Sequence, residues 1–331
     1  MDIDTFALSA ILSLGLGSAF GWVVERSGFC TMGAISDLVI FQSNRRLKVW
    51  ALAVATAALG LTVWPAGAPA LGGVSLGQLA LAATGGLIFG YGMVLTGGCV
   101  SRCLVRTGAG SVKAALVLVV LFATALLVLT GLNPTPIMVA ERIQNASDTG
   151  PVTRLVPALL AACLLVWILN DRRFRRFSTD TTAGLVMGFC VVMVFIVDDI
   201  PQASGLNFLD PVAAPSGYVA VSGVSLLVGT VLGASLSAAA RGSFRLEFFV
   251  DRADIARNGV GALFLGLGGA LVGACTVGAG MSGVASLSLA AIVATAAMMA
   301  GAAGAVQVLL AGGLGRFAGR IGGLWRRSGR M

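Results

Sequence analysis

Two stretches of this 331-residue chain decide its fold: residues 85–99, which read GGLIFGYGMVLTGGC, and residues 261–275, which read GALFLGLGGALVGAC. Glycine recurs at the same intervals in both, and both end on cysteine: Gly85, Gly90, Gly92 and Cys99 correspond to Gly261, Gly266, Gly268 and Cys275. The stretches superpose without a gap at an offset of 176 residues (261 − 85 = 176). They predict an internal duplication, with each copy an apolar helix that ends in a glycine-rich turn carrying a cysteine.

The composition around these stretches is that of a membrane protein. Hydrophobic residues make up 57% of the chain and charged residues only 11%, against about 25% charged in ordinary globular proteins. Apolar runs long enough to cross a bilayer predict nine helices, at residues 6–24, 49–66, 75–96, 112–132, 152–170, 180–197, 217–240, 259–274 and 284–312. We therefore expect an all-α, polytopic membrane protein that forms a single integral membrane domain over residues 1–331.

The loops between the expected helices sort by charge. Basic residues concentrate in one set of segments: residues 45–48, 172–176, 241–257 and 313–331. The other loops carry one basic residue among them: residues 65–74, 133–151 and 198–216. By the positive-inside rule the first set is cytoplasmic, with the N-terminus outside the inner membrane and the C-terminus inside. The net charge of +8 is divided among short loops, which argues against a nucleic-acid partner and for the lipid bilayer.

The two copies of the duplicated helix are expected to face opposite ways, because external loops flank the first copy and cytoplasmic segments flank the second. The chain then divides into a first half-repeat, a connecting span with a basic loop, a second half-repeat and a basic tail, at residues 1–132, 133–178, 179–312 and 313–331. Inverted repeats of this type bring broken helices together near the bilayer midplane and form the substrate site there.

Three glycine-rich turns with a cysteine interrupt the apolar pattern: residues 27–33 (SGFCTMG), 97–102 (GGCVSR) and 273–278 (GACTVG). Irregular backbone at membrane depth is tolerated where it is buried in protein or lines a polar cavity. Glycine leaves backbone N–H groups uncovered, and a helix that starts after the turn points its positive end at the gap, so the turns favour an anion. The candidate pathway residues are the cysteines and their neighbours: Cys30, Cys99, Cys275, Gly28, Thr31, Gly33, Gly98, Thr276 and Gly278.

The charged residues near the turns and the three other cysteines have less certain roles in the sequence than the turns themselves. Four charges near the turns are candidates for attracting or gating an anion, although each also fits a snorkelling end residue or an ion pair: Glu25, Arg26, Arg102 and Arg106. Cys163 and Cys190 lack a glycine-rich turn, so we expect them to be small buried packing residues. The role of Cys103 stays open.

Several classes of function are excluded or disfavoured. The chain contains no histidine, so imidazole metal sites and histidine-based catalysis are excluded, and no GxxxxGK[ST] loop for ATP is present. We expect no catalytic residue, metal or cofactor. A membrane thiol–disulfide or sulfurtransferase enzyme is an alternative, but it needs a cysteine of lowered pKa. A channel for another small solute is a second alternative, and it leaves the three cysteines without a role.

At residues 27–37 (SGFCTMGAISD), 95–99 (LTGGC), 104–110 (LVRTGAG) and 275–283 (CTVGAGMSG) the chain closely resembles the YeeE/YedE family of bacterial sulfur-transport membrane proteins. The resemblance implies a nine-span inner-membrane protein of hourglass shape, whose loops dip to a central constriction. It implies uptake of thiosulfate, passed by S–H hydrogen bonds along successive thiols without covalent capture. The family's three pathway cysteines match Cys30, Cys99 and Cys275. A cytoplasmic sulfur-carrier protein that docks on the basic loops is a further implied partner.

The chain departs from the family pattern at two positions. Ala274 stands where a glycine usually precedes the third cysteine, which is expected to tighten that turn. Cys103 stands where a small or hydroxyl residue is expected, so no role for it follows from the resemblance. Some relatives are linked to selenium metabolism, so the resemblance supports a sulfur-type anion more firmly than it supports thiosulfate.

Overall fold

The computed structural model describes residues 3–63, 76–131, 159, 161–168, 170, 178–197, 206–213, 218–249 and 251–311. This part of the chain is helical and contains no β-strand, as the sequence predicts. Its long helices are α1 (Ile3–Ser27), α3 (Arg45–Val63), α4 (Leu76–Thr96), α6 (Val112–Gly131), α9 (Ser178–Val197), α11 (Tyr218–Ala240), α12 (Arg252–Val272) and α13 (Leu289–Leu310). Its short elements are α2 (Thr31–Phe41), α5 (Val100–Gly108), α10 (Asp210–Ala213) and the π-helix η3 (Gly278–Gly283).

Seven candidate membrane spans occur among the described residues, and two of them run through a break, from α1 into α2 and from α4 into α5. Helix α3 is not one of the seven, and the expected span at 152–170 lies mostly outside the described residues. The count of nine crossings therefore stays a prediction. Large apolar side chains on the outer faces of the helices are exposed, for example Ile11 (67%), Val119 (68%) and Leu127 (72%), as contact with lipid requires.

The last helix begins later than expected. The helix expected over residues 284–312 begins at Leu289, because Leu287 adopts a left-handed conformation (φ +56°) and ends the preceding turn. The side chain of Ser288 then accepts a hydrogen bond from the N–H of Ala291 at 3.3 Å, which caps the new helix. The apolar run does not reveal this break, since residues 284–289 (VASLSL) contain no glycine, proline or charged residue.

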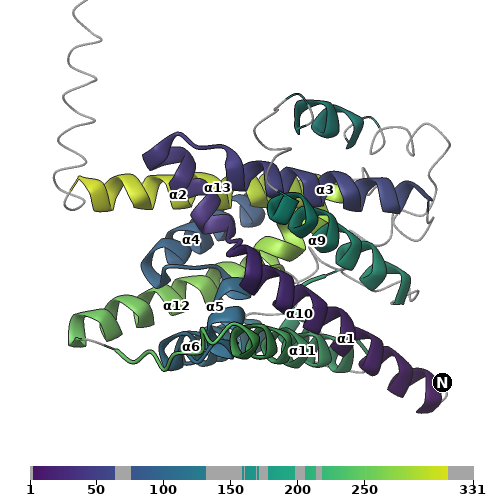
Figure 1. Ribbon diagram of the computed structural model, residues 1–331. Coiled ribbons are helices and arrows are strands. Elements are labelled where there is room, and N and C mark those ends of the chain that lie inside the picture. The colour runs from purple at the N-terminus through teal and green to yellow at the C-terminus, as the bar shows by residue number, and fades with distance from the viewer. Residues whose placement is uncertain are drawn as a thin grey trace, which may run out of the picture.

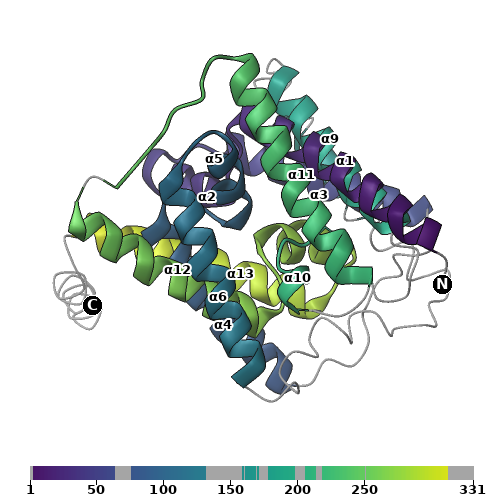
Figure 2. The same ribbon diagram turned by 90° about the horizontal axis from the view of Figure 1, so that it is seen from below.

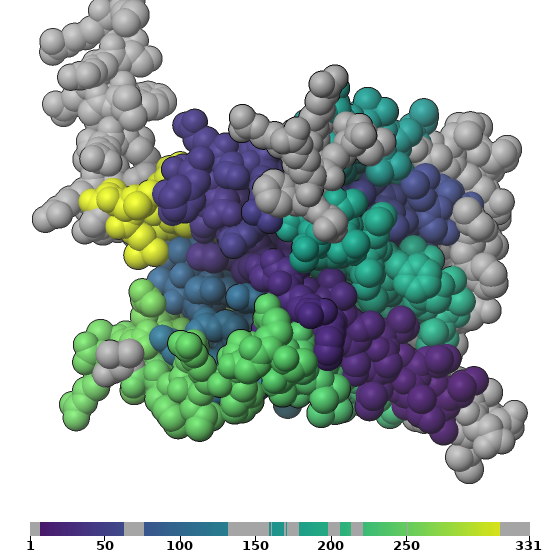
Figure 3. All heavy atoms as spheres, in the orientation of Figure 1, coloured from purple at the N-terminus to yellow at the C-terminus, as the bar shows by residue number. Residues whose placement is uncertain are grey.

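The helices pack closely through glycine. Helix α1 lies along α11 and against α9 (Figure 3), α4 lies between α12 and α13, and α3 lies on α9. A Cβ atom on Gly90 of α4 would lie 2.2 Å from the carbonyl oxygen of Met298 in α13, and one on Gly233 of α11 would lie 2.0 Å from that of Ser18 in α1. Any larger side chain would push these helices apart, which is how small residues permit packing in lipid.

The two duplicated helices, α4 and α12, pack on each other crosswise through their matching glycines. A Cβ on Gly85 would meet the carbonyl of Gly268 at 3.1 Å, and a Cβ on Gly92 would meet that of Gly261 at 2.8 Å. Because Gly85 corresponds to Gly261 and Gly92 to Gly268, this contact stays the same when the two copies are exchanged. The duplicated sequence therefore builds one shared contact in the middle of the fold.

The arrangement leaves short elements in the interior. Figure 1 shows α3 and α13 on one side of the molecule and α6 and α11 on the other, with α4 and α5 between them. From below, α5 and α10 lie among the long helices (Figure 2). The start of α1 and the end of α13 lie at opposite ends of the molecule (Figure 1). Helix α5 follows the glycine break at Gly97, so the fold carries this break into its core.

Candidate functional site

The three cysteine turns are built alike. A glycine in the left-handed region precedes each cysteine by two residues, with φ of +62° at Gly28, +71° at Gly97 and +74° at Gly273. These glycines lie at the ends of α1, α4 and α12, where a residue with a side chain would be strained. The chain is then extended at Cys30 and Cys99, which immediately precede α2 and α5. Each cysteine thus stands at the start of a helical segment, where backbone N–H groups lack intrahelical partners.

The structure brings residues of all three turns together. The thiol of Cys99 lies next to the side chains of Cys30 and Thr276, and its Sγ is 3.1 Å from Oγ of Ser101. Cys99 and Cys275 are fully buried, and Cys30 is 7% exposed. All three are free thiols. A cluster of thiols and hydroxyls, drawn from segments far apart in the sequence, therefore forms in the core.

The backbone around each cysteine faces its sulfur atom. The N–H of Gly278 donates to Sγ of Cys275 at 3.4 Å, and the N–H groups of Gly33 and Arg102 face the thiols of Cys30 and Cys99. In each case the N–H belongs to the third residue after the cysteine. A sulfur that accepts from the backbone in this way keeps its S–H free to donate to another group.

Two hydroxyls next to the cysteines are buried without a hydrogen-bond partner among the described residues. These are Oγ1 of Thr31, which follows Cys30, and Oγ1 of Thr276, which follows Cys275. Leaving a buried polar group unpaired costs about 1–3 kcal/mol, and native structures contain few such groups. Two of them beside the same thiol cluster indicate a place that accommodates a polar ligand.

The sequence did not identify Asn207, which holds the third turn in position. Its Oδ1 accepts from the N–H of Cys275 at 3.0 Å, and its Nδ2 donates to the carbonyl of Gly273 at 3.3 Å. We expected residues 198–216 to form an external loop. Residues 206–209 are irregular, as in a loop, but Leu206 to Leu209 are fully buried or nearly so. The offset of 176 residues was the missed signal, because it takes Cys30 to Leu206 (30 + 176 = 206).

Three of the four candidate gating charges make structural contacts instead. Glu25 forms an ion pair with Arg241, and Arg106 forms one with Glu247 at 2.9 Å. The guanidinium of Arg106 lowers the pKa of Glu247 below its ordinary value. The guanidinium of Arg26 lies over the indole ring of Trp22 in the same helix, with 5.6 Å between its Cζ and the ring centroid. These contacts tie the ends of the helices together, and they favour the ion-pair alternative for Glu25 and Arg106.

Arg102 is different from these three. Its side chain has no hydrogen bond or ion pair with any described residue, and its charge acts on the thiols of Cys30 and Cys103. It lies in the first turn of α5, directly beside the thiol cluster. A half-buried cation at this place attracts an anion to the cluster, so Arg102 remains a candidate for that role.

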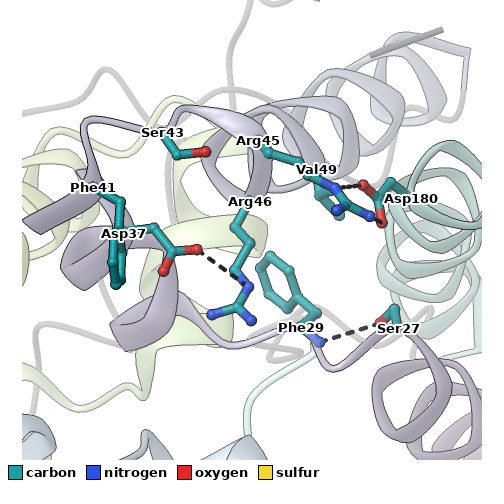
Figure 4. Close-up of a pocket in the computed structure, with 9 residues that line it drawn as sticks. All are labelled: Ser27, Phe29, Asp37, Phe41, Ser43, Arg45, Arg46, Val49 and Asp180. Atoms are coloured by element: carbon teal, nitrogen blue, oxygen red, sulfur yellow. Dashed lines mark hydrogen bonds and ion pairs between the residues drawn. The ribbon is translucent and has the colours of Figure 1, made fainter. Parts of the chain in front are cut away.

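A cavity of about 530 Å³ lies between the Cys30 turn and the start of α3 (Figure 4). Its lining residues are Ser27, Phe29, Asp37, Phe41, Ser43, Arg45, Arg46, Val49 and Asp180. Arg45 is bound by Asp180, while Arg46 lies 3.4 Å from Asp37 and extends over the first turn of α2. A Cβ atom built on Gly33 would lie 2.7 Å from Nη1 of Arg46. In the sequence analysis these arginines served only to assign the topology. The structure shows that they line a cavity beside the Cys30 turn.

The remaining cysteines differ in burial. Cys190 is 1% exposed in α9, as expected for a packing residue. Cys163 is exposed, so its expected burial is wrong. It shares its exposed face with Val166 and Trp167, so in a bilayer this face contacts lipid. Cys103 is 2% exposed and lies one helical turn after Cys99.

Comparison with known proteins agrees with this architecture. The profile of the family described as sulphur transport matches residues 26–304, which include all three cysteine turns. A protein of Spirochaeta thermophila named thiosulfate transporter TsuA is 27% identical over 312 residues, which cover 83% of this chain and 91% of the relative. The Escherichia coli K12 protein of the same name is 26% identical over 319 residues, covering 82% and 87%. These relatives are transporters and not enzymes, and the present chain, with its apolar spans, belongs to the sulphur transport family of multi-pass membrane proteins.

Proposed function

We propose that this chain takes up a small sulfur-containing anion, thiosulfate, across the inner membrane into the cytoplasm. The names of the two relatives support the choice of substrate. The observation that carries the proposal is the convergence of the cysteine turns, which gathers thiols, unpaired hydroxyls and helix N-termini in one buried place. Such a place offers hydrogen-bond donors to an anion and no carboxylate in the cluster to repel it.

The proposed pathway uses the thiols of Cys30, Cys99 and Cys275, with no covalent bond to the substrate. The residues that shape it are the neighbours of these cysteines: Gly28, Thr31, Gly33, Gly98, Thr276 and Gly278. A hydrogen bond between neutral groups contributes about 0.5–1.5 kcal/mol, and one to a charged group about 1.5–3 kcal/mol. Several neutral donors therefore compensate an anion for part of its lost hydration, while none of them holds it as firmly as a buried lysine or arginine would.

We also propose that residues 1–132 and 179–312 are inverted halves that meet at these turns. The offset of 176 residues takes α1, α3, α4 and α6 onto α9, α11, α12 and α13. The packing pairs follow the same exchange: α1 with α11 corresponds to α9 with α3, and α4 with α13 corresponds to α12 with α6. The crosswise glycine contact of α4 and α12 supports the same symmetry. An inverted arrangement suits alternating exposure of a midplane site to the two sides.

The cavity at Arg45 and Arg46 is the proposed cytoplasmic exit. Both arginines stand in the first turn of α3, in the basic segment 45–48 that the charge rule assigns to the cytoplasm. An anion that leaves the Cys30 turn meets two cations there, Arg45 paired with Asp180 and Arg46 paired with Asp37. A cytoplasmic sulfur-carrier protein would dock on the same basic face.

Uptake of labelled thiosulfate by a strain that lacks its own thiosulfate import tests the proposal. Replacing Cys30, Cys99 or Cys275 by alanine should abolish most uptake at equal expression, because the S–H donor is lost. Serine should retain part of it, because a hydroxyl still donates. The matched control is Cys190→Ala, which removes a buried thiol outside the site and should transport normally.

Two results contradict the proposal. One is wild-type-level uptake by the alanine variants. The other is a stable extra sulfur on one of the three cysteines, seen by intact-mass spectrometry after turnover under non-reducing conditions, together with serine variants as inactive as alanine variants. That combination would mean covalent sulfur transfer.

A further inference from the structure

Two further polar groups are buried without a hydrogen-bond partner among the described residues: Nε1 of Trp50 in α3 and Oγ1 of Thr295 in α13. The side chain of Thr295 is almost fully enclosed, with 7% of the residue exposed. Both groups point at the same place. A Cβ built on Gly280 of η3 would lie 3.5 Å from Nε1 and 3.8 Å from Oγ1. Two unpaired donors from different helices therefore converge over one glycine.

The fold explains why these groups meet. Helices α3 and α13 both pack against η3, which continues from the Cys275 turn. The π-helical winding of η3 is uncommon and occurs frequently at functional sites. Gly280 has no side chain, so nothing from η3 fills the place between the indole and the hydroxyl. The pair lies little more than one helical turn beyond Cys275, on the side of α3.

The chemistry of the two groups limits what they can bind. An indole N–H only donates, so only an atom with a lone pair satisfies it, and a metal cation does not. A threonine hydroxyl can donate to the same acceptor. The occupant is therefore an anion or a water molecule. Because two donors from different helices converge here while neither has a hydrogen-bond partner among the described residues, the arrangement favours an occupant with more than one acceptor atom.

We propose that Trp50 and Thr295 form a second anion-holding station, which binds the oxygen atoms of thiosulfate beside the Cys275 turn. This inference rests on the proposed uptake function. Val49, the neighbour of Trp50, lines the cavity that contains Arg45 and Arg46. The station thus shares a helix, α3, with the two arginines of the proposed exit.

Three substitutions test the station in the full-length protein, with labelled thiosulfate as the probe. Trp50→Phe and Thr295→Val each remove one donor and keep most of the side-chain volume, and each should raise the KM of uptake about tenfold. Thr295→Ser keeps the hydroxyl and should stay close to wild type. Gly280→Ala puts a methyl group at ordinary contact distance from both donors and should reduce uptake with the fold intact.

The matched control is Gly304→Ala, since a Cβ on Gly304 of α13 meets no atom within 4 Å. This variant should transport normally.

Purified protein provides a second measurement, the rise in the unfolding midpoint that thiosulfate produces. This rise should be smaller in Trp50→Phe and Thr295→Val than in wild type. If both variants keep the wild-type KM and the wild-type shift, water occupies the pair and the station is refuted. Failure of the wild-type protein itself to import thiosulfate would instead refute the proposed function.

Discussion

Replacing Asn207 by leucine should release the Cys275 turn from the segment that positions it. The amide makes four hydrogen bonds: Oδ1 accepts from Cys275 N at 3.0 Å and from Leu209 N at 3.3 Å, and Nδ2 donates to Gly273 O at 3.3 Å and to Asp210 Oδ1 at 2.7 Å. At about 1 kcal/mol each, their loss lowers the free energy of unfolding by roughly 4 kcal/mol. The N–H of Cys275 would also be left buried and unpaired.

The assay combines uptake with the reactivity of Cys275. In the wild-type protein Cys275 is fully buried, so a membrane-permeant maleimide should label it slowly. In Asn207→Leu the labelling rate should rise and thiosulfate uptake should fall at least tenfold at equal expression. Asn207→Asp keeps the acceptor for Cys275 N but loses the Nδ2 donor, so its labelling rate should lie between those of the wild type and the leucine variant.

Asn258→Leu is the matched control, because Asn258 is an equally buried amide of α12 and lies roughly 20 Å along the helix from Gly273. It bonds to Asp254 at 2.7 and 2.9 Å. Its replacement should lower stability and leave the reactivity of Cys275 unchanged. If Asn207→Leu labels and transports as the wild type does, Asn207 is not a positioning residue for Cys275. If Asn258→Leu raises Cys275 labelling as much as Asn207→Leu, the effect reflects general loosening and the reasoning also fails.

Two further predictions concern the helix ends. Single reporter cysteines at exposed positions of residues 241–257 should be labelled from the cytoplasm and those at 135–150 from outside; labelling of 241–257 by an impermeant reagent added to intact cells would overturn the inverted arrangement. The ion pair with Arg106 lowers the pKa of Glu247 from 4.5, so its contribution is complete above the unfolded pKa and is lost as the pH falls through the lower folded value. Amide-exchange protection of the loop around Glu247 should therefore fall in acid, and in Glu247→Gln it should be lower already at pH 7 and change less.

Local properties of the sequence predicted much of the fold and the nature of the site. Helix type and span length follow from apolar runs, which any membrane-spanning segment needs in order to satisfy its backbone in lipid. The positions of the cysteine turns follow from glycine, because only glycine readily adopts the left-handed conformation found at Gly28, Gly97 and Gly273. The spacing of glycine and cysteine also predicted the duplication to which α4 and α12 belong.

Only the tertiary structure decided which groups meet. The sequence places Cys99 and Thr276 in separate motifs, and helix packing sets them side by side. It gives no sign that Glu25 pairs with Arg241, or that Trp50 and Thr295 converge on Gly280. Hydropathy responds to the average character of a segment, whereas these contacts depend on how helices distant in sequence cross and rotate. The sequence therefore determined where the three cysteine turns interrupt the helices, and long-range packing determined what each turn faces.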